Sequence, residues 1–468
     1  MKKTIALVAL LSILSVFSFY VIGEAVTREK TNVTIKENVI YGDKSYADGV
    51  TVTTRASYDD HLFWDTAYTI SATPKTTSDF EFYYSEHYEA PQRSTNGIVL
   101  DLDLKHGYDL RKSASESKGL QKAYRELYDS IPQGSSGSKT IKLQDYYDYL
   151  PIRVALDIPG VSWNGNDYDN LTAEYKNERA VWEKFNEYFK IPIPKDLPEF
   201  VISVSKGYDS IGMSGFILDF YFNTQTAYTG NKIYFSIRNK YYHIEEEKEE
   251  RYVDTSMIPG GYGIYSLDYS YKNKADYNVD YQTGIEAESL TTVYPLEQHQ
   301  EVIRLMMSND QTKLLMFTQE QSEMYLTVID VATMSQIQKI RIGALEQYSF
   351  NDYDNYIVIR GIYKIAVIEK LDSGLCNLAF VADRNPEIDV NHYFTGYATA
   401  MAFDGQRLVI IERSENQRMR AVGTCDFEVA VYTSDGLVYF GLYESSLSSY
   451  SINSPSDCDL VGYCVKFE

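Results

Sequence analysis

The stretch TKLLMFTQEQSEMYLTVIDVATMSQIQKIRI, residues 312–342, contains three runs of apolar and β-branched residues separated by polar turns. Short runs of this composition, bounded by turn residues, predict β-strands. The same rhythm returns in residues 354–381 (DNYIVIRGIYKIAVIEKLDSGLCNLAFV). It returns again in residues 406–444, where QRLVIIERSE is followed by FEVAVYTSDGLVYFGLYE. The sequence therefore predicts a small β-sheet unit that recurs along the C-terminal half of the chain.

A recurring unit of ~40–50 residues with four short strands is the sequence pattern of a β-propeller blade. One such sheet cannot bury both of its faces, so the units must pack against one another. Residues 201–468 have room for about six units of this length. An irregular β-sandwich or an open meander is the competing interpretation of the same strands.

The remaining sequence divides into three further parts. Residues 1–26 are expected to form a single N-terminal hydrophobic helix, and residues 27–105 a β-rich domain with alternating apolar and polar positions. Residues 106–200 are expected to form a small mixed α/β insert, because two segments, 119–131 and 177–189, carry apolar residues at helical spacing. The predicted fold class is thus mainly β, with propeller-like repeats over residues 201–468.

The N-terminal segment has the features of an export signal or membrane anchor. Lys2 and Lys3 precede residues 4–22, nineteen positions without a charged side chain. As a helix these span roughly 28 Å, about the thickness of the hydrocarbon core. The basic flank predicts that the rest of the chain crosses the membrane. We favour an uncleaved, single-pass signal-anchor, and cleavage after the small-x-small sequence at residues 23–25 would instead give a secreted protein.

Charge and composition exclude some partners. Hydrophobic residues make up 44% of the chain and charged residues 24%, which is typical of globular proteins. The formal net charge of −22 gives an acidic field that repels phosphate backbones. We therefore expect no nucleic-acid partner, and any membrane association must come from the N-terminal helix.

The cysteines permit a disulfide without requiring one. All four lie near the C-terminus, and Cys458 and Cys464 are separated by only five residues. This spacing makes their loop the easiest to close in an oxidising compartment. Four buried free thiols are the alternative.

The sequence contains none of the common catalytic patterns, so no catalytic residue is predicted. The G-x-S-x-G nucleophile elbow, the H-E-x-x-H zinc motif and the phosphate-binding P-loop are all absent. We therefore expect no cofactor and no nucleotide, with calcium as the one exception. The segment NGNDYDNLTAE supplies hard oxygen donors for calcium at Asn164, Asn166, Asp167, Asp169 and Glu174. Turn geometry explains the same Asn and Asp residues equally directly.

Tyrosine is unusually abundant, with 43 residues against 20 phenylalanines and 3 tryptophans. Clusters occur in residues 81–90 (EFYYSEHYEA), 145–150 and 240–247. Tyrosine suits strands, and it also suits exposed recognition surfaces because its ring is apolar and its tip is polar. The predicted ligand-binding residues are those in loops of the central insert, where no strand requires them: Tyr146, Tyr147, Tyr149, Trp163 and Tyr168.

Two resemblances accompany these patterns. The repeats of the C-terminal half resemble WD40- and quinoprotein-like propeller blades in strand order, although they lack the WD40 signature dipeptides. The strings HLFWDTAYTI (61–70), WEKFNEYFKIPIP (182–194) and IPGGYGIYS (258–266) are similar to those of uncharacterised exported or membrane-anchored proteins of Gram-positive gut bacteria. The second resemblance implies export and names no activity.

The sequence thus predicts an extracytoplasmic, membrane-anchored binding or scaffolding protein with a protein or glycan ligand. The alternative is an extracytoplasmic hydrolase of glycans or peptides whose acids come from separate loops. A sensory partner of a signalling system is a third interpretation.

Overall fold

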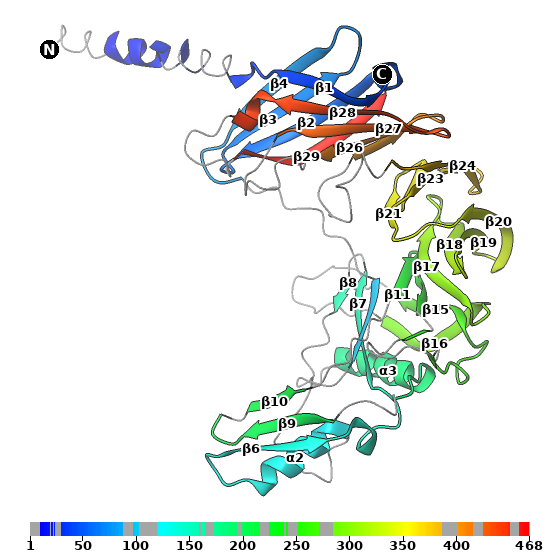
Figure 1. The fold of residues 1–468 in the computed structure, drawn as a ribbon. Helices are drawn as coiled ribbons and strands as arrows, with labels where there is room; N and C mark the ends of the chain where they lie inside the picture. The colour runs from blue at the N-terminus through cyan, green and yellow to red at the C-terminus, as the bar shows by residue number, and fades with distance from the viewer. Residues whose placement is uncertain are drawn as a thin grey trace. The chain divides into compact units, whose positions relative to one another are not determined.

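The computed structural model describes residues 10–18, 20–21, 23, 30–87, 97–102, 119–158, 161–163, 173–193, 199–208, 210–215, 224–237, 240–241, 251–270, 284–385, 400–414, 425–449 and 458–467. The chain forms two compact units (Figure 1). Unit 1 comprises Met1–Gln92, Leu345–Leu371 and Cys376–Glu468, and unit 2 comprises Arg93–Ala344 and Asp372–Leu375.

The described residues of unit 1 form three antiparallel sheets. The first has the order β29 (Cys458–Phe467), β2 (Val50–Tyr58), β3 (Leu62–Thr69), β4 (Lys75–Phe82). The second has the order β21 (Ser349–Asp352), β22 (Tyr356–Arg360), β23 (Lys364–Lys370), β24 (Cys376–Asp383). The third has the order β25 (Ala400–Phe403), β26 (Leu408–Arg413), β27 (Phe427–Thr433), β28 (Gly436–Ser445), β1 (Ile35–Gly42). Short 3-10 helices follow β1 and β28: η1 (Lys44–Ala47) and η3 (Ser446–Ser449).

Strands from the two ends of the chain share sheets in unit 1 (Figure 1). The C-terminal strand β29 pairs antiparallel with β2, from Val50 opposite Phe467 to Tyr58 opposite Cys458. The N-terminal strand β1 pairs with β28 at the outer edge of the five-stranded sheet. Backbone hydrogen bonds between distant segments therefore hold the ends of the chain together.

A buried network of tyrosines and one carboxylate connects these two sheets. The Tyr439 hydroxyl donates to Glu37 Oε1 at 3.2 Å, and the Tyr439 and Tyr443 hydroxyl oxygens are 2.8 Å apart. Tyr68 donates to the other Glu37 oxygen at 3.5 Å, and Lys44 Nζ lies 2.5 Å from it. Burial of polar groups is tolerated here because each has a hydrogen-bond partner.

This network makes the stability of unit 1 sensitive to alkaline pH. Burial, with the nearby Glu37 carboxylate, raises the pKa of Tyr68 to about 12 and also raises the pKa of Tyr443. A tyrosine in an unfolded chain ionises near pH ~10. The unfolded state therefore loses protons that the folded state keeps, so stability that is complete below about pH 10 is lost as the pH rises toward about 12.

We expect the free energy of unfolding, measured in urea from about pH 8 to about pH 12, to fall with pH. The slope should be smaller in Tyr443→Phe, which removes one of the raised ionisations. Equal slopes for the two proteins would show that these tyrosines do not carry the effect.

Unit 2 contains two further four-stranded sheets with consecutive strands. One is formed by β17 (Gln300–Met307), β18 (Lys313–Glu320), β19 (Glu323–Asp330) and β20 (Ser335–Gly343). The other is formed by β11 (Thr224–Tyr228), β12 (Lys232–Ile237), β15 (Gly263–Ser270) and β16 (Gly284–Pro295). A three-stranded sheet has the order β5 (Gly97–Leu102), β7 (Ile152–Ile158), β8 (Val161–Trp163), and β13 (Lys240–Tyr241) pairs with β14 (Arg251–Tyr252).

In unit 2 the first strands of the two four-stranded sheets lie next to each other, β11 beside β17, and β5 of the three-stranded β5–β7–β8 sheet lies beside β11. In unit 1, β25 lies beside β29 in the same way. Neighbouring sheets that meet along their first strands are arranged as blades are in a propeller. The fold is therefore propeller-like in both units.

A helix on a small sheet forms the rest of unit 2. Helix α2 (Gly119–Ser130) packs on a sheet of order β10 (Ser210–Ser214), β9 (Phe200–Ser205), β6 (Ser136–Ile141). Its apolar stripe of Leu120, Tyr124 and Leu127 is buried. Helix α3 (Ala173–Tyr188) packs on β7 and β16, and η2 (Leu143–Asp145) lies between β6 and β7.

The recurring β-sheet unit predicted for residues 312–342, 354–381 and 406–444 is confirmed. The first apolar run of each of these ranges is a strand, β18, β22 or β26, and each is the second strand of its sheet. The two helices predicted in residues 106–200 are also confirmed as α2 and α3.

The division of the chain differs from the predicted one. The predicted boundary at residue 105 separates β5 from its partner β7, and the boundary at residue 200 separates β6 from its partner β9. The strands of residues 27–105 do not form a domain of their own, because β1 and β2 hydrogen-bond to C-terminal strands.

The predicted N-terminal anchor lies partly outside the described residues. Residues 10–18, 20–21 and 23 are helical. Within the part of the chain that the structure describes, no helix combines the length and apolar character needed to cross a membrane.

Candidate functional site

The predicted ligand-binding tyrosines that the structure describes have different environments. The Tyr147 hydroxyl accepts a hydrogen bond of 3.0 Å from the Leu120 backbone N–H at the start of α2. Tyr146 also packs, partly buried, against the core of unit 2. Tyr149 is 40% exposed, and Lys190 Nζ lies 5.4 Å from the centre of its ring. Tyr147 therefore has a structural role.

The other predicted site residues are described incompletely. Trp163 ends β8, but its side chain and all of Tyr168 lie outside the described residues. The same holds for the calcium candidates Asn164, Asn166, Asp167 and Asp169, and for the side chain of Glu174 in α3. In the described ranges, no three His, Cys, Asp or Glu side chains gather as metal ligands. The calcium site stays a prediction.

The predicted disulfide between Cys458 and Cys464 is wrong. Both residues lie in the extended strand β29, which places their Cα atoms about 20 Å apart at ~3.3 Å per residue. A disulfide needs Cα atoms within about 7 Å. Cys464 is a free, exposed thiol, and Cys376 and Cys425 are buried and reduced.

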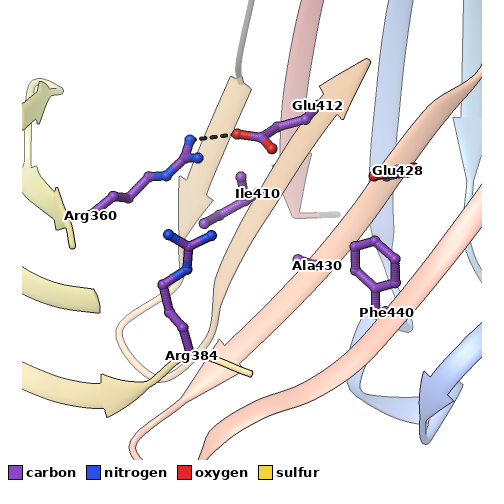
Figure 2. A pocket seen from close by; sticks show the side chains of 7 residues that line it. All are labelled: Arg360, Arg384, Ile410, Glu412, Glu428, Ala430 and Phe440. Carbon is purple, nitrogen blue, oxygen red and sulfur yellow. Dashed lines mark ion pairs between the residues drawn. The ribbon is translucent and has the colours of Figure 1, made fainter. Parts of the chain in front are cut away.

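A charged pocket lies between two sheets of unit 1. Arg360 at the end of β22 and Arg384 after β24 face Glu412 of β26 and Glu428 of β27 (Figure 2). The apolar part of the lining comes from β26, β27 and β28: Ile410, Ala430 and Phe440. Figure 2 shows the side chains of Arg360 and Glu412 pointing toward each other.

The charges in this pocket are matched by protein groups. Arg360 and Glu412 form an ion pair of 2.5 Å, with side chains only 11% and 13% exposed. Arg384 donates to the Gly361 carbonyl at 2.8 Å, and Glu428 accepts from the Ser414 hydroxyl at 2.9 Å. The space of about 250 Å³ is partly open solvent, and its enclosed part holds about one water molecule. Because the pocket is small and its charges are paired within the protein, it fits a joint between sheets, that is, a structural contact that holds two sheets together, better than it fits a substrate-binding site.

Sequence reasoning did not find this pocket. Its arginines and glutamates lie near the ends of strands in separate repeats, so no spacing along the chain brings them together. Only the packing of the β21–β24 sheet against the β25–β28 sheet does so.

A second site lies where β4 ends in unit 1. Phe82 is 52% exposed and Tyr84 is 89% exposed, and their rings meet edge to face at 5.0 Å. We call these two residues the β4 aromatic surface. On the opposite face of the same segment, the Tyr83 and His87 rings stack at 4.1 Å. Large aromatic side chains that are this exposed at the end of an ordered strand are typical of contact surfaces.

The opposite side of β4 carries a chain of polar contacts. Arg55 of β2 forms an ion pair with Asp65 of β3, and its other terminal nitrogen lies 3.2 Å from Glu81 of β4. The Tyr83 hydroxyl donates to Glu81 at 3.2 Å. Burial and the Glu81 carboxylate raise the pKa of Tyr83. These contacts fix the conformation of the chain where the aromatic surface begins.

The sequence carried a signal for this second site. Residues 81–90 form one of the tyrosine clusters, but their alternation also fits an ordinary strand. The strand in fact ends at Phe82, so Tyr84 lies beyond the pairing that would have explained it.

Comparisons with known proteins give no family. No family model matches the chain, and no curated protein matches it. Among solved structures, a functionally unknown protein from Desulfotomaculum acetoxidans DSM 771 is 8% identical, with 88% of this chain and 89% of that chain covered and a TM-score of 0.26.

Two other solved structures match over about half of this chain. The Cps50 (Swd1) β-propeller domain from Myceliophteria thermophila is 10% identical, covering 52% of this chain and 80% of that chain, with a TM-score of 0.23. A protein from Lactobacillus plantarum is 12% identical, covering 56% and 79%, with a TM-score of 0.23. TM-scores of this size do not establish a common fold, so the propeller-like description rests on the strand order of the sheets.

Proposed function

We propose that this chain is an extracytoplasmic binding or scaffolding protein that contacts its partner through the β4 aromatic surface. The observation that carries the proposal is the exposure of Phe82 and Tyr84 at the end of a regular strand. Interfaces are enriched in aromatic residues because one ring contributes a large contact area at a small cost in side-chain entropy.

The location is supported by the sequence. Lys2, Lys3 and the uncharged residues 4–22 fit a segment that exports the body and holds it at the membrane. A binding protein held in this way would present its sheets outside the cell, where a protein or glycan of the envelope is within reach.

The test is co-sedimentation of the body, residues 27–468, with isolated envelopes of Gram-positive bacteria. We expect the wild-type body to sediment with the envelopes. The double variant Phe82→Ala/Tyr84→Ala should bind at least about tenfold more weakly, since removing an aromatic anchor from an interface commonly costs ~2 kcal/mol or more.

The matched control is Tyr208→Ala, because Tyr208 is also 89% exposed but lies in unit 2. This variant should bind as the wild type does. If the double variant and the control bind equally well, or if the wild type does not sediment, the proposed function is wrong.

A further inference from the structure

We propose that the free edge of β4 accepts an extended segment of a partner protein as an additional antiparallel strand, and that this segment alternates basic with apolar residues. The inference rests on the proposed function, which it deepens by naming the kind of partner.

β4 lies at the end of its sheet, and the backbone register shows which groups face outward. The Tyr83 N–H donates to the His61 carbonyl at 2.9 Å, which makes these two residues a hydrogen-bonded pair. In an antiparallel pair such positions alternate, so the N–H and C=O groups of Ser78, Phe80 and Phe82 point away from β3. No strand of the described residues pairs with these groups, so they are open to a further strand.

The edge of β4 lacks the irregularity found on comparable edges. Among the end strands of the five sheets of four or more strands, β1, β16, β20 and β24 each pair with a register shift, whereas β4 pairs with β3 over eight residues without one. The end strands β11, β21 and β25 are also regular, but β11 and β25 lie beside strands of neighbouring sheets. A bulge twists an edge away from new partners. The regular edge of β4 therefore remains a template for strand addition.

The charges across this sheet favour a basic partner. Arg55, Asp65 and Asp79 are directly opposite one another on β2, β3 and β4, so two carboxylates are adjacent at the edge. Like charges in directly opposed positions are unfavourable, and a cation in the next strand would relieve them. Glu81 lies on the same face two residues along, which predicts a second cation at the same alternation.

The other face of β4 supplies the apolar half of the pattern. Phe80 packs on the buried Trp64 with ring centres 5.2 Å apart, and Phe82 beside it is half exposed. An incoming residue between the two cations would point to this face and cover Phe80 or Phe82.

The net charge of the chain selects this occupant over a second copy. With a formal charge of −22, two copies repel each other, whereas a basic segment is attracted. A second copy at this edge is thus an outcome that the test must separate from the proposal.

The test is the binding of a fluorescent peptide, GVKVKTG, to the body of residues 27–468. We expect binding to GVKVKTG and not to GVEVETG. In Asp79→Lys the preference should fall at least about tenfold, about 1.4 kcal/mol. This variant should remain folded, because it replaces one of two adjacent carboxylates by a cation. A GVKVKTG peptide with alternate N-methylated amides should not bind, since it keeps the charges but loses the pairing edge.

Hydrogen exchange shows where on the protein the peptide binds. The amides of Ser78, Phe80 and Phe82 should become protected by the peptide, whereas the inward amides of Thr77 and Asp79 are protected already. Equal binding of the two peptides, or no new protection at these amides, would overturn strand addition. Self-association that Asp79→Lys abolishes would also overturn it, in favour of a second copy. If GVKVKTG does not bind while envelope binding still depends on Phe82 and Tyr84, strand addition at β4 is wrong and the proposed function stands.

Discussion

Glu412→Ala is expected to lower the free energy of unfolding of unit 1 by about 3 kcal/mol. Glu412 is the carboxylate partner of Arg360 at 2.5 Å in the charged pocket, and both side chains are nearly buried. Removing one member of a buried ion pair leaves the other charge with poorer compensation in a medium of low dielectric constant. The measurement is urea denaturation followed by tryptophan fluorescence, because Trp64 lies in the core of unit 1.

Two comparisons make this prediction specific. Glu444→Ala removes the surface ion pair between Glu444 and Lys36. Because the Glu444 side chain is 44% exposed and the Lys36 side chain 79% exposed, this variant should change the free energy of unfolding by at most ~1 kcal/mol. The double variant Arg360→Met/Glu412→Met should recover most of the loss, because two apolar side chains of similar volume need no charge compensation. If Glu412→Ala costs no more than Glu444→Ala, the pocket is not a joint between sheets.

The strand content of the repeats could be predicted from the sequence because each strand is marked locally. The run from Leu314 to Phe317 is apolar and buried, and segments of mostly polar residues follow it at residues 319–323 and 332–336. The helices could be predicted for the same reason, since Val181, Phe185 and Phe189 recur at helical spacing and are buried.

The assembly of the sheets could not be predicted in this way. Nothing in the sequence of β2 specifies that its partner is β29, because the hydrogen-bonding edge of a strand carries no residue code. The predicted division at residue 105 failed for this reason, and so did the disulfide. A short separation along the chain suggested contact between Cys458 and Cys464, but an extended strand holds them apart.

The two candidate sites also differ in whether the local sequence could reveal them. The β4 aromatic surface is local, and the tyrosine cluster of residues 81–90 marked it. The pocket of Arg360 and Glu412 is formed by residues from separate repeats, so only the packing of two sheets reveals it.

Thr53→Cys is expected to form a disulfide with the native Cys464. The two residues are directly opposite on β2 and β29, and Cys464 is exposed and free. Opposed residues of an antiparallel pair have Cα atoms ~4.5–5.5 Å apart, within the range that a disulfide requires. Because the bond would close a very long loop, oxidation should stabilise the protein by about 2–5 kcal/mol.

The control is Thr54→Cys, one residue along β2, whose side chain points to the opposite face of the sheet. It should leave Cys464 free under the same mild oxidation. Both variants keep the other native cysteines, so any unspecific oxidation will appear equally in the two proteins.

The fold depends most on the pairing of β2 with β29, which joins the two ends of the chain within a single sheet. The most direct test is mass spectrometry of oxidised, proteolysed Thr53→Cys. A crosslinked peptide joining residues 53 and 464, absent from Thr54→Cys, is the predicted result. A free Cys464 in oxidised Thr53→Cys, or a crosslink to another cysteine, would contradict the pairing of β2 with β29 and the propeller-like order built on it.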